Sequence, residues 1–204
     1  MAGIFSTGAE VPCLIFVDFD HTLLGGNSTE LFIANSRPFA VVSVLNFLVR
    51  KCIPWRLVRT RNWFRLRDYA FCRLLFTLLP HNLERWREMG PAIFEQLRNF
   101  ELEEVLEPMP QRRISIVTFG MEAIVKPMLR GSRWEQVDIL ATPRVTSLSY
   151  FSNGKLEMAR HAYGDEALAK SMLITDSEDD LDLLQAVGRP VLIVPHGAPR
   201  HGRH

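Results

Sequence analysis

Cys13-Leu-Ile-Phe-Val17, followed directly by Asp18-Phe-Asp-His-Thr22, is the stretch that decides the fold. The first part is short and almost wholly apolar, which is typical of a strand buried on both faces of a parallel sheet. Asp18 and Asp20 follow where this strand ends, and ligands of open α/β sheets bind outside the carboxyl ends of the strands. Aspartate also forms turns. The pair alone therefore leaves two interpretations open, a simple strand end or a functional site.

Further short apolar runs match the first one, and they lie at Ile114–Val117, Met172–Thr175 and Val191–Val194. Helix-like stretches follow two of them, at 121–130 and 179–187, and a fifth strand is predicted over Val137–Ala141. This alternation predicts right-handed βαβ units and a doubly wound, Rossmann-like parallel α/β core. The segment 145–159, with Asn153-Gly154 near its middle, predicts a β-hairpin.

The region between the first two strands has a different texture, with long helical periodicity interrupted at Pro54, Pro80 and Gly90-Pro91. We therefore expect an inserted all-helical cap over residues 25–108. The α/β core would comprise residues 11–24 and 109–196. Residues 197–204, rich in His, Gly and Arg, are expected to form a flexible tail.

Composition limits the class of protein. The chain has 204 residues, 47% of them hydrophobic, and a net charge of +1, which argues against nucleic-acid binding over its whole surface. Its three cysteines have no paired spacing, which fits a reducing compartment. The N-terminal residues lack the pattern of a secretory signal, and no apolar run is long enough to span a bilayer. We therefore expect a cytoplasmic protein.

The strand Met172–Thr175 is followed by a second acidic cluster, which comprises Asp176, Glu178, Asp179 and Asp180. So many carboxylates at one strand end repel each other unless a cation neutralises them. Oxygen ligands at two neighbouring strand ends favour a hard cation that keeps several waters, which indicates Mg²⁺. Some of these carboxylates would also cap the following helix at its positive end.

A third element follows the strand Ile114–Val117. Thr118 places a hydroxyl at the strand end, and Gly120 precedes the next helix. A hydroxyl beside the free N–H groups of a helix start is suited to hold a phosphate. The motif gains weight because the two acidic strand ends accompany it.

Together these motifs resemble those of the haloacid dehalogenase-like superfamily of phosphatases and phosphotransferases. The resemblance is to its phosphoserine-phosphatase-like branch, which carries a helical cap after the first strand. Asp18-Phe-Asp-His-Thr-Leu23 matches the DxDxT signature of that family, Ile116–Gly120 its hydroxyl motif and Thr175–Asp180 its acidic motif. The resemblance spans Leu14 to Pro195.

The resemblance implies a phosphomonoester phosphatase. Asp18 would be the nucleophile that forms an aspartyl-phosphate, and Asp20 would be the general acid and base. Thr118 and Gly120 would bind phosphate oxygens. Mg²⁺ would be the cofactor. Its expected ligands are Asp18, Asp20, Asp176 and Asp180.

The family also needs a lysine at a helix start before the acidic motif. Ala167 stands about where that lysine is expected, and Lys170, one turn later, is our candidate. Lys155 is the second choice by its distance in sequence from the acidic motif, although its position reads as part of a hairpin. The helix expected before Met172 also looks shorter than in the family. This shortened motif leaves an alternative function open, a weakened or inactive member of the fold that serves as a binding or membrane-surface module.

The segment Arg50–Arg73 holds eight basic residues and a single acid, Asp68, interleaved with aromatic residues. One interpretation is a solvated cap helix, whose arginines pair with the glutamates of 84–107. Another is peripheral contact with an anionic membrane, which would suit a phospholipid head group as substrate instead of a small phosphorylated metabolite. No motif supports nucleic acid as a partner, and the oligomeric state is not indicated.

Overall fold

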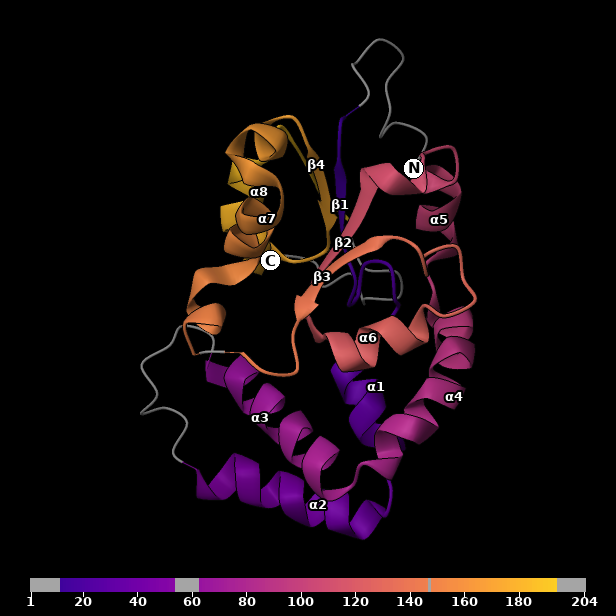
Figure 1. Cartoon of the computed structure of the whole chain (residues 1–204), viewed down its shortest axis with the longest axis vertical. Coiled ribbons are helices and arrows are strands. Elements are labelled where there is room, and N and C mark those ends of the chain that lie inside the picture. The colour runs from indigo at the N-terminus through magenta and orange to yellow at the C-terminus, as the bar shows by residue number, and fades with distance from the viewer. Residues whose placement is uncertain (1–11, 54–62, 147, 194–204) are drawn as a thin grey trace, which may run out of the picture.

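The computed structural model describes residues 12–53, 63–146 and 148–193, and a parallel five-stranded sheet lies at its centre (Figure 1). The strand order is β3-β2-β1-β4-β5, and every neighbouring pair is parallel. The strands are β1 Ile15–Asp18, β2 Ile114–Met121, β3 Asp138–Thr142, β4 Met172–Thr175 and β5 Arg189–Leu192. The predicted doubly wound α/β core is confirmed, with the aspartate-bearing strand at the centre of the sheet.

The register brings the three predicted motifs to one edge. Asp18 pairs with Val117 of β2, and Val17 pairs with Ile174 of β4. Because all strands are parallel, their carboxyl ends lie at the same edge of the sheet. Thr118, within β2, and Asp176, directly after β4, therefore lie at about the level where Asp18 ends β1.

Two apolar layers cover the sheet, one on each face. Phe16 and Leu173 pack with α7 (Leu148–Ala169) and α8 (Leu181–Ala186). Ile15 and Val17 face the other way, into the cluster that includes residues of α4 (His81–Leu97), α5 (Phe100–Leu106) and α6 (Glu122–Met128). Successive residues of β1 thus alternate between faces, as the pleat requires, and Figure 1 shows α7 and α8 on the opposite side from α4 and α5.

The described part of the segment between β1 and β2 is mainly helical, as predicted. It contains α1 Ser28–Asn35, α2 Phe39–Phe47, η1 Leu48–Cys52, α3 Trp63–Leu78, α4 His81–Leu97 and α5 Phe100–Leu106. Side-chain caps start two of these helices, because Asn27 Oδ1 accepts from the Glu30 N–H and Asn99 Oδ1 accepts from the Leu102 N–H. The boundaries at residues 25 and 108 stay a prediction.

The α4 helix ties this inserted segment to the core. The indole N–H of Trp86 donates to the carbonyl of Ile124 on α6 at 2.9 Å. A Cβ on Gly90 would meet Met128 at 3.4 Å, so the glycine lets the two helices approach closely. The cap therefore sits on a firmly anchored helix.

The predicted hairpin over 145–159 is wrong, because α7 begins at Leu148 and takes up the rest of that segment. This helix connects β3 to the parallel strand β4, and such a connection crosses a face of the sheet, usually as a helix. Gly154 and Gly164 interrupt the helical backbone at φ of 74° and 80°. The Asn-Gly pair thus marks a kink in a helix and not a hairpin turn. The predicted tail, 197–204, lies outside the described residues.

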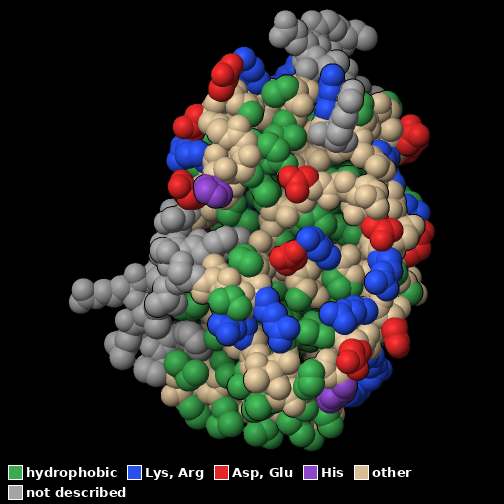
Figure 2. Space-filling model, in the orientation of Figure 1, with side chains coloured by type: hydrophobic (Ala, Val, Ile, Leu, Met, Phe, Trp, Pro, Cys, Tyr) green, Lys and Arg blue, Asp and Glu red, His purple; other side chains and the backbone are tan. Residues whose placement is uncertain are grey.

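Short helical turns complete the chain, at η3 Gln111–Arg113 before β2 and η4 Glu178–Asp180 before α8. Apolar side chains gather over α2, at the base of the molecule in the space-filling view (Figure 2). Within the described ranges, no helix combines the length and apolar character needed to cross a membrane.

Candidate active site

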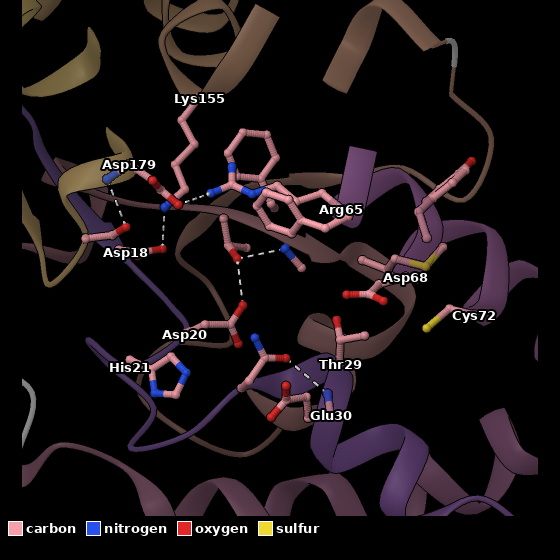
Figure 3. Close-up of a pocket in the computed structure, with 18 of the residues that line it drawn as sticks. Asp18, Asp20, His21, Thr29, Glu30, Arg65, Asp68, Cys72, Lys155 and Asp179 are labelled. Carbon is pink, nitrogen blue, oxygen red and sulfur yellow. Dashed lines mark hydrogen bonds and ion pairs between the residues drawn. The ribbon is translucent and has the colours of Figure 1, made fainter. Parts of the chain in front are cut away.

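A pocket of about 430 Å³ opens at the carboxyl edge of the sheet (Figure 3). The core contributes residues at or just after the carboxyl ends of β1, β2 and β4, and the inserted segment contributes residues of α1 and α3. Its lining includes Asp18, Asp20, Thr118, Gly120, Lys155 and Asp176. Five of these six were predicted site residues, and the structure brings them into one cavity.

Asp18 ends β1 and is almost fully buried, with 4% of its surface exposed. Its Oδ1 atom accepts from the backbone N–H of Phe19 at 2.8 Å, and the hydroxyl of Thr175 donates to Oδ2 at 3.3 Å. Burial raises the pKa of Asp18 to about 7, although the neighbouring ammonium of Lys155 acts in the opposite direction. The carboxylate is thus held rigidly at a pKa close to neutrality.

Asp20 lies in the loop after β1, with its carboxylate held by two donors. The backbone N–H of Ser28 at the start of α1 donates to Oδ1 at 2.6 Å, and the Thr118 hydroxyl donates to Oδ2 at 3.3 Å. Burial raises the pKa of Asp20, and the Ser28 hydrogen bond offsets part of that rise. His21, the next residue, adopts a left-handed backbone with φ of 60°, which turns the chain toward α1.

The lysine at this site is Lys155. Its ammonium lies 2.7 Å from Asp18 Oδ1 and 2.8 Å from Asp180 Oδ2, and only 6% of the side chain is exposed. Burial by itself would lower the pKa of Lys155, but the attraction of the two carboxylates outweighs it and raises the pKa. Lys155 is therefore charged and fixed between two aspartates.

Lys170, the residue expected in this position, lies elsewhere. Its ammonium pairs with Glu166 at 2.7 Å, and 65% of its side chain is exposed. The reason is the direction of the chain, since Lys170 follows the end of α7 and directly precedes β4. It therefore lies at the amino edge of the sheet, about 10 Å of strand away from the aspartates. The structure therefore places Lys155, and not the predicted Lys170, beside the aspartates.

A topological signal in the sequence could have found Lys155. A helix that connects two parallel strands runs antiparallel to them, so its first turns lie at the carboxyl edge and its last turns at the amino edge. Only a lysine near the start of α7 can reach Asp18. The hairpin interpretation of the same residues concealed this signal.

Asp180, expected as a metal ligand, is engaged by other groups. It is 3% exposed, and its Oδ2 atom receives the Lys155 ammonium and the Thr175 hydroxyl, each at 2.8 Å. Its contacts thus orient Lys155. A direct role for Asp180 in metal binding stays a prediction.

Asp176 lies after β4 and faces the loop that follows β1. The Thr22 hydroxyl donates to Asp176 Oδ1 at 3.0 Å and is within the same distance of the Asp176 backbone N–H. Within the described residues, no three side chains of His, Cys, Asp or Glu are grouped closely enough to form a metal site by themselves. Two carboxylates, a backbone carbonyl and retained waters nevertheless form a donor set that suits Mg²⁺. Asp18, Asp20 and Asp176 fit that set.

Thr118 and Gly120 lie in the last part of β2, beside Asp20, where the register with β3 shifts. The Gly120 N–H donates to Thr118 Oγ1 at 2.9 Å. A Cβ at Gly120 would lie 2.9 Å from Val125 Cγ2 and 3.1 Å from Ser28 Oγ, so no larger residue fits without a shift. This close packing keeps the backbone at the end of β2 next to the Asp20 carboxylate.

Arg65 of α3 is a site residue that the sequence analysis did not single out from the basic segment. Its guanidinium lies 3.8 Å from the centre of the Phe119 ring and 3.4 Å from Asp179 Oδ2. Figure 3 shows it extending from α3 toward Lys155. It thereby joins α3 to the last part of β2 and to the turn after β4. The basic spacing alone carried no signal that distinguishes Arg65 from its neighbours.

The other described cations of the basic segment behave differently from the expectation of pairing with the glutamates of 84–107. Arg67 and Arg50 both approach Asp68, at 2.9 and 3.8 Å. None of the ion pairs found among the described residues links this segment to those glutamates; Glu95 and Glu103 instead pair with Arg98. Arg56, Arg59 and Arg61 lie outside the described residues.

Comparison with known proteins agrees with this geometry. Residues 15–185 match the family described as HAD, haloacid dehalogenase-like hydrolase. A search among curated proteins finds no match.

Several solved structures share the fold. A phosphoserine phosphohydrolase-like protein from Francisella tularensis aligns over 88% of this chain and 86% of its own, with 16% identity and a TM-score of 0.55. A protein of unknown function from Bordetella pertussis aligns over 90% and 91%, with 20% identity and a TM-score of 0.55. A phosphoserine phosphatase in apo form covers 88% and 85%, at 16% identity and a TM-score of 0.50. At these identities the likeness is one of fold.

Proposed function

The chain belongs to the haloacid dehalogenase-like hydrolase family, and from this premise we propose that it is a Mg²⁺-dependent phosphomonoester phosphatase that acts through Asp18. One observation carries the proposal. A buried lysine contacts the carboxylate that ends the central strand, in a pocket that also holds Asp20, Thr118 and Asp176. That combination can receive a phosphoryl group and balance its charge.

Asp18 is the nucleophile in this proposal. One of its carboxylate oxygens attacks phosphorus as the bond between phosphorus and the substrate oxygen breaks, which leaves an aspartyl-phosphate. Attack requires the ionised carboxylate, and burial raises the pKa of Asp18 to about 7. The Lys155 ammonium at 2.7 Å favours the ionised form and reduces repulsion between Asp18 and an incoming phosphate.

Asp20 is the general acid and then the general base. It gives a proton to the departing alkoxide, and in the second step it takes a proton from the water that attacks the aspartyl-phosphate. The reaction thereby returns both carboxyl groups to their starting states and releases inorganic phosphate. Burial raises the pKa of Asp20, which favours the protonated form that the first step needs.

The phosphate oxygens are received by Lys155, the Thr118 hydroxyl and the backbone around Gly120. Asp18, the Asp20 carbonyl and Asp176 would hold Mg²⁺, which supplies charge neutralisation during phosphoryl transfer when it is bound. Lys155 is the protein's own contribution to the same balance. Three carboxylates beside a phosphate dianion carry more negative charge than one divalent cation offsets.

The proposed substrate is a phosphomonoester whose alcohol portion fits between α1 and α3, either a small metabolite or a phospholipid head group. The pocket volume of about 430 Å³ supports a small group. Arg65 adds a cation on the α3 side, where a second anionic or polar group of the substrate would lie.

Hydrolysis of p-nitrophenyl phosphate with and without Mg²⁺ tests the proposal, with Asp18→Asn as the matched variant. We expect Mg²⁺-dependent turnover by the wild type and a loss of at least about 10³-fold in the variant. Wild-type turnover equal to that of Asp18→Asn would sink the assignment, provided that both proteins show the same circular dichroism spectrum.

A further inference from the structure

The α2 helix and the η1 turn after it present an apolar face to solvent. We name this surface the α2 face and define it by its exposed apolar residues: Phe39, Val41, Val44, Phe47, Leu48 and Ile53. Phe39 and Phe47 are 66% and 61% exposed. Figure 2 shows these apolar side chains gathered at the base of the molecule. Contiguous apolar surface of this kind usually marks an interaction site.

The helix does not need these residues for its own packing. Val42, Leu45 and Val49 follow a spacing of three and four residues and contact the core. The outward residues therefore belong to a second apolar side of the same helix, which the described structure leaves uncovered. A helix that is apolar nearly all round is normally buried.

The sequence around α2 is basic. No acidic residue occurs anywhere between Glu30 and Asp68 in the sequence, whereas the interval holds eight basic residues. Arg37 precedes α2, and Arg50 and Lys51 lie in η1, so exposed cations stand at both ends of the face. Arg50 approaches Asp68 only at 3.8 Å and shares that carboxylate with Arg67. The rim of the α2 face is therefore positively charged.

We propose that the α2 face docks on a membrane surface that carries anionic lipids. The apolar side chains would enter the boundary between head groups and acyl chains, while Arg37, Arg50 and Lys51 contact the phosphates of the head groups. With nine residues, α2 is too short to span a bilayer, so it lies in the plane of the interface.

The charge pattern selects lipid over a second copy of the chain. Two copies related by a two-fold axis would present the same surface to each other, and each would bring its cations against those of its partner. A lipid surface supplies the opposite charge together with an apolar interior. The inference does not depend on catalysis, since it concerns a surface of α2 and not the pocket.

Flotation of the full chain with lipid vesicles tests the proposal. The vesicles would be phosphatidylcholine alone, or phosphatidylcholine with about 30% phosphatidylglycerol. We expect binding to the anionic vesicles, weaker binding to the neutral ones, and a decrease as salt rises. Equal binding to both kinds of vesicle, or binding to neither, would overturn the proposal.

Two matched pairs of variants locate the surface. Val44→Ser with Phe47→Ser should weaken partitioning at least about tenfold, whereas Val145→Ser with Phe100→Ser, equally exposed but outside the face, should not. Arg50→Glu with Lys51→Glu should abolish the preference for anionic lipid, unlike the control Arg160→Glu with Lys170→Glu.

Turnover of a soluble substrate separates this inference from the proposed function, since the α2 variants should keep wild-type turnover. If Val44→Ser with Phe47→Ser binds vesicles like the wild type, the α2 face is not the docking surface. If the wild type fails to bind vesicles but forms a dimer that these substitutions dissolve in sedimentation velocity, the occupant is a second copy and the lipid proposal is wrong.

Discussion

The ammonium of Lys155 lies between Asp18 Oδ1 at 2.7 Å and Asp180 Oδ2 at 2.8 Å, so one cation connects the end of β1 with the turn after β4. All three side chains are almost fully buried. A buried charge of this kind is stable only with its partners in place. Removing Lys155 would leave two buried carboxylates that repel each other and the substrate phosphate.

Lys155→Met should therefore lower turnover of p-nitrophenyl phosphate by at least about 10³-fold, because the phosphate loses its neutralising contact. Lys170→Met is the matched control and should stay within about twofold of the wild type, since its ammonium pairs only with exposed Glu166. Steady-state kinetics at saturating Mg²⁺ measure both. A strong loss in Lys170→Met with an active Lys155→Met would restore the original assignment.

The sequence was sufficient to predict the strands and the motifs at their ends. Buried parallel strands are short and apolar, and β1, β2 and β4 have this character with little competition from other patterns. Because a parallel sheet gathers its carboxyl ends at one edge, Asp18, Thr118 and Asp176 could be expected together before any coordinates.

The crossover after β3 was harder to predict, because its local signals conflict with its topology. Asn153-Gly154 has the composition of a hairpin turn, yet Gly154 serves as a kink at φ of 74° inside α7. The contacts of Arg65 depend on how α3 packs over the sheet. Packing between distant segments leaves no mark in a single basic stretch, and so Arg65 could not be selected.

The kink at Gly154 provides a second prediction. Gly154 and Gly131 both have φ of 74°, and a Cβ added to either would meet no atom within 4 Å. Alanine at a positive φ costs about 1–3 kcal/mol, and the cost is larger at Gly154, whose ψ of −179° is open to little but glycine, so both Gly154→Ala and Gly131→Ala should be less stable than the wild type in urea. Gly154 precedes Lys155, whereas Gly131 lies after α6, so only Gly154→Ala should also lower kcat. Equal kcat in the two variants would mean that the kink does not aim the lysine.

The ionisation of Asp18 gives a prediction for the metal-free protein. Its pKa is raised from 3.8 to about 7 in the folded chain, so the folded state holds this proton more tightly than the unfolded state. Stability contributed by the protonated form is complete below about pH 4 and is lost as the pH rises toward 7. Asp18→Asn cannot ionise. Its unfolding free energy relative to the wild type should therefore increase between pH 4 and 7, by at most about 4 kcal/mol.

Urea denaturation of both proteins in EDTA across this pH range measures the difference in unfolding free energy. Asp20 titrates in both proteins, so most of its contribution to that difference cancels. Saturating Mg²⁺ should reduce the gain, because a cation beside a carboxylate lowers its pKa. A difference between the two proteins that stays constant from pH 4 to 8 in EDTA would show that Asp18 ionises normally.

Gly120 provides a prediction on the end of β2, where we propose that phosphate oxygens bind. A Cβ there would lie 2.9 Å from Val125 Cγ2 and 3.2 Å from Thr118 Oγ1, while one on Gly26 would meet only Leu31 Cδ1 at 3.6 Å. Gly120→Ala should therefore displace the backbone at the end of β2 and lower kcat/KM by about 10²-fold. Gly26→Ala, in the loop before α1, should remain within about threefold of the wild type. Equal losses of kcat/KM in the two variants would contradict a special role for the backbone at Gly120.

Arg65 connects α3 to the core through Phe119 at 3.8 Å and Asp179 at 3.4 Å. Arg65→Gln should raise KM about tenfold, because the pocket loses a cation that faces an anionic substrate and a contact that holds α3 over the site. Arg67→Gln is the control, since Arg67 has the same exposed side-chain fraction of 18% but pairs with Asp68 within α3.

Inhibition by inorganic phosphate distinguishes the loss of the cation from the loss of the contact that holds α3. If Arg65 attracts the anion itself, phosphate should bind more weakly to Arg65→Gln; if phosphate binding is unchanged while KM rises, Arg65 acts on the alcohol portion or on α3. An unchanged KM in Arg65→Gln would contradict both.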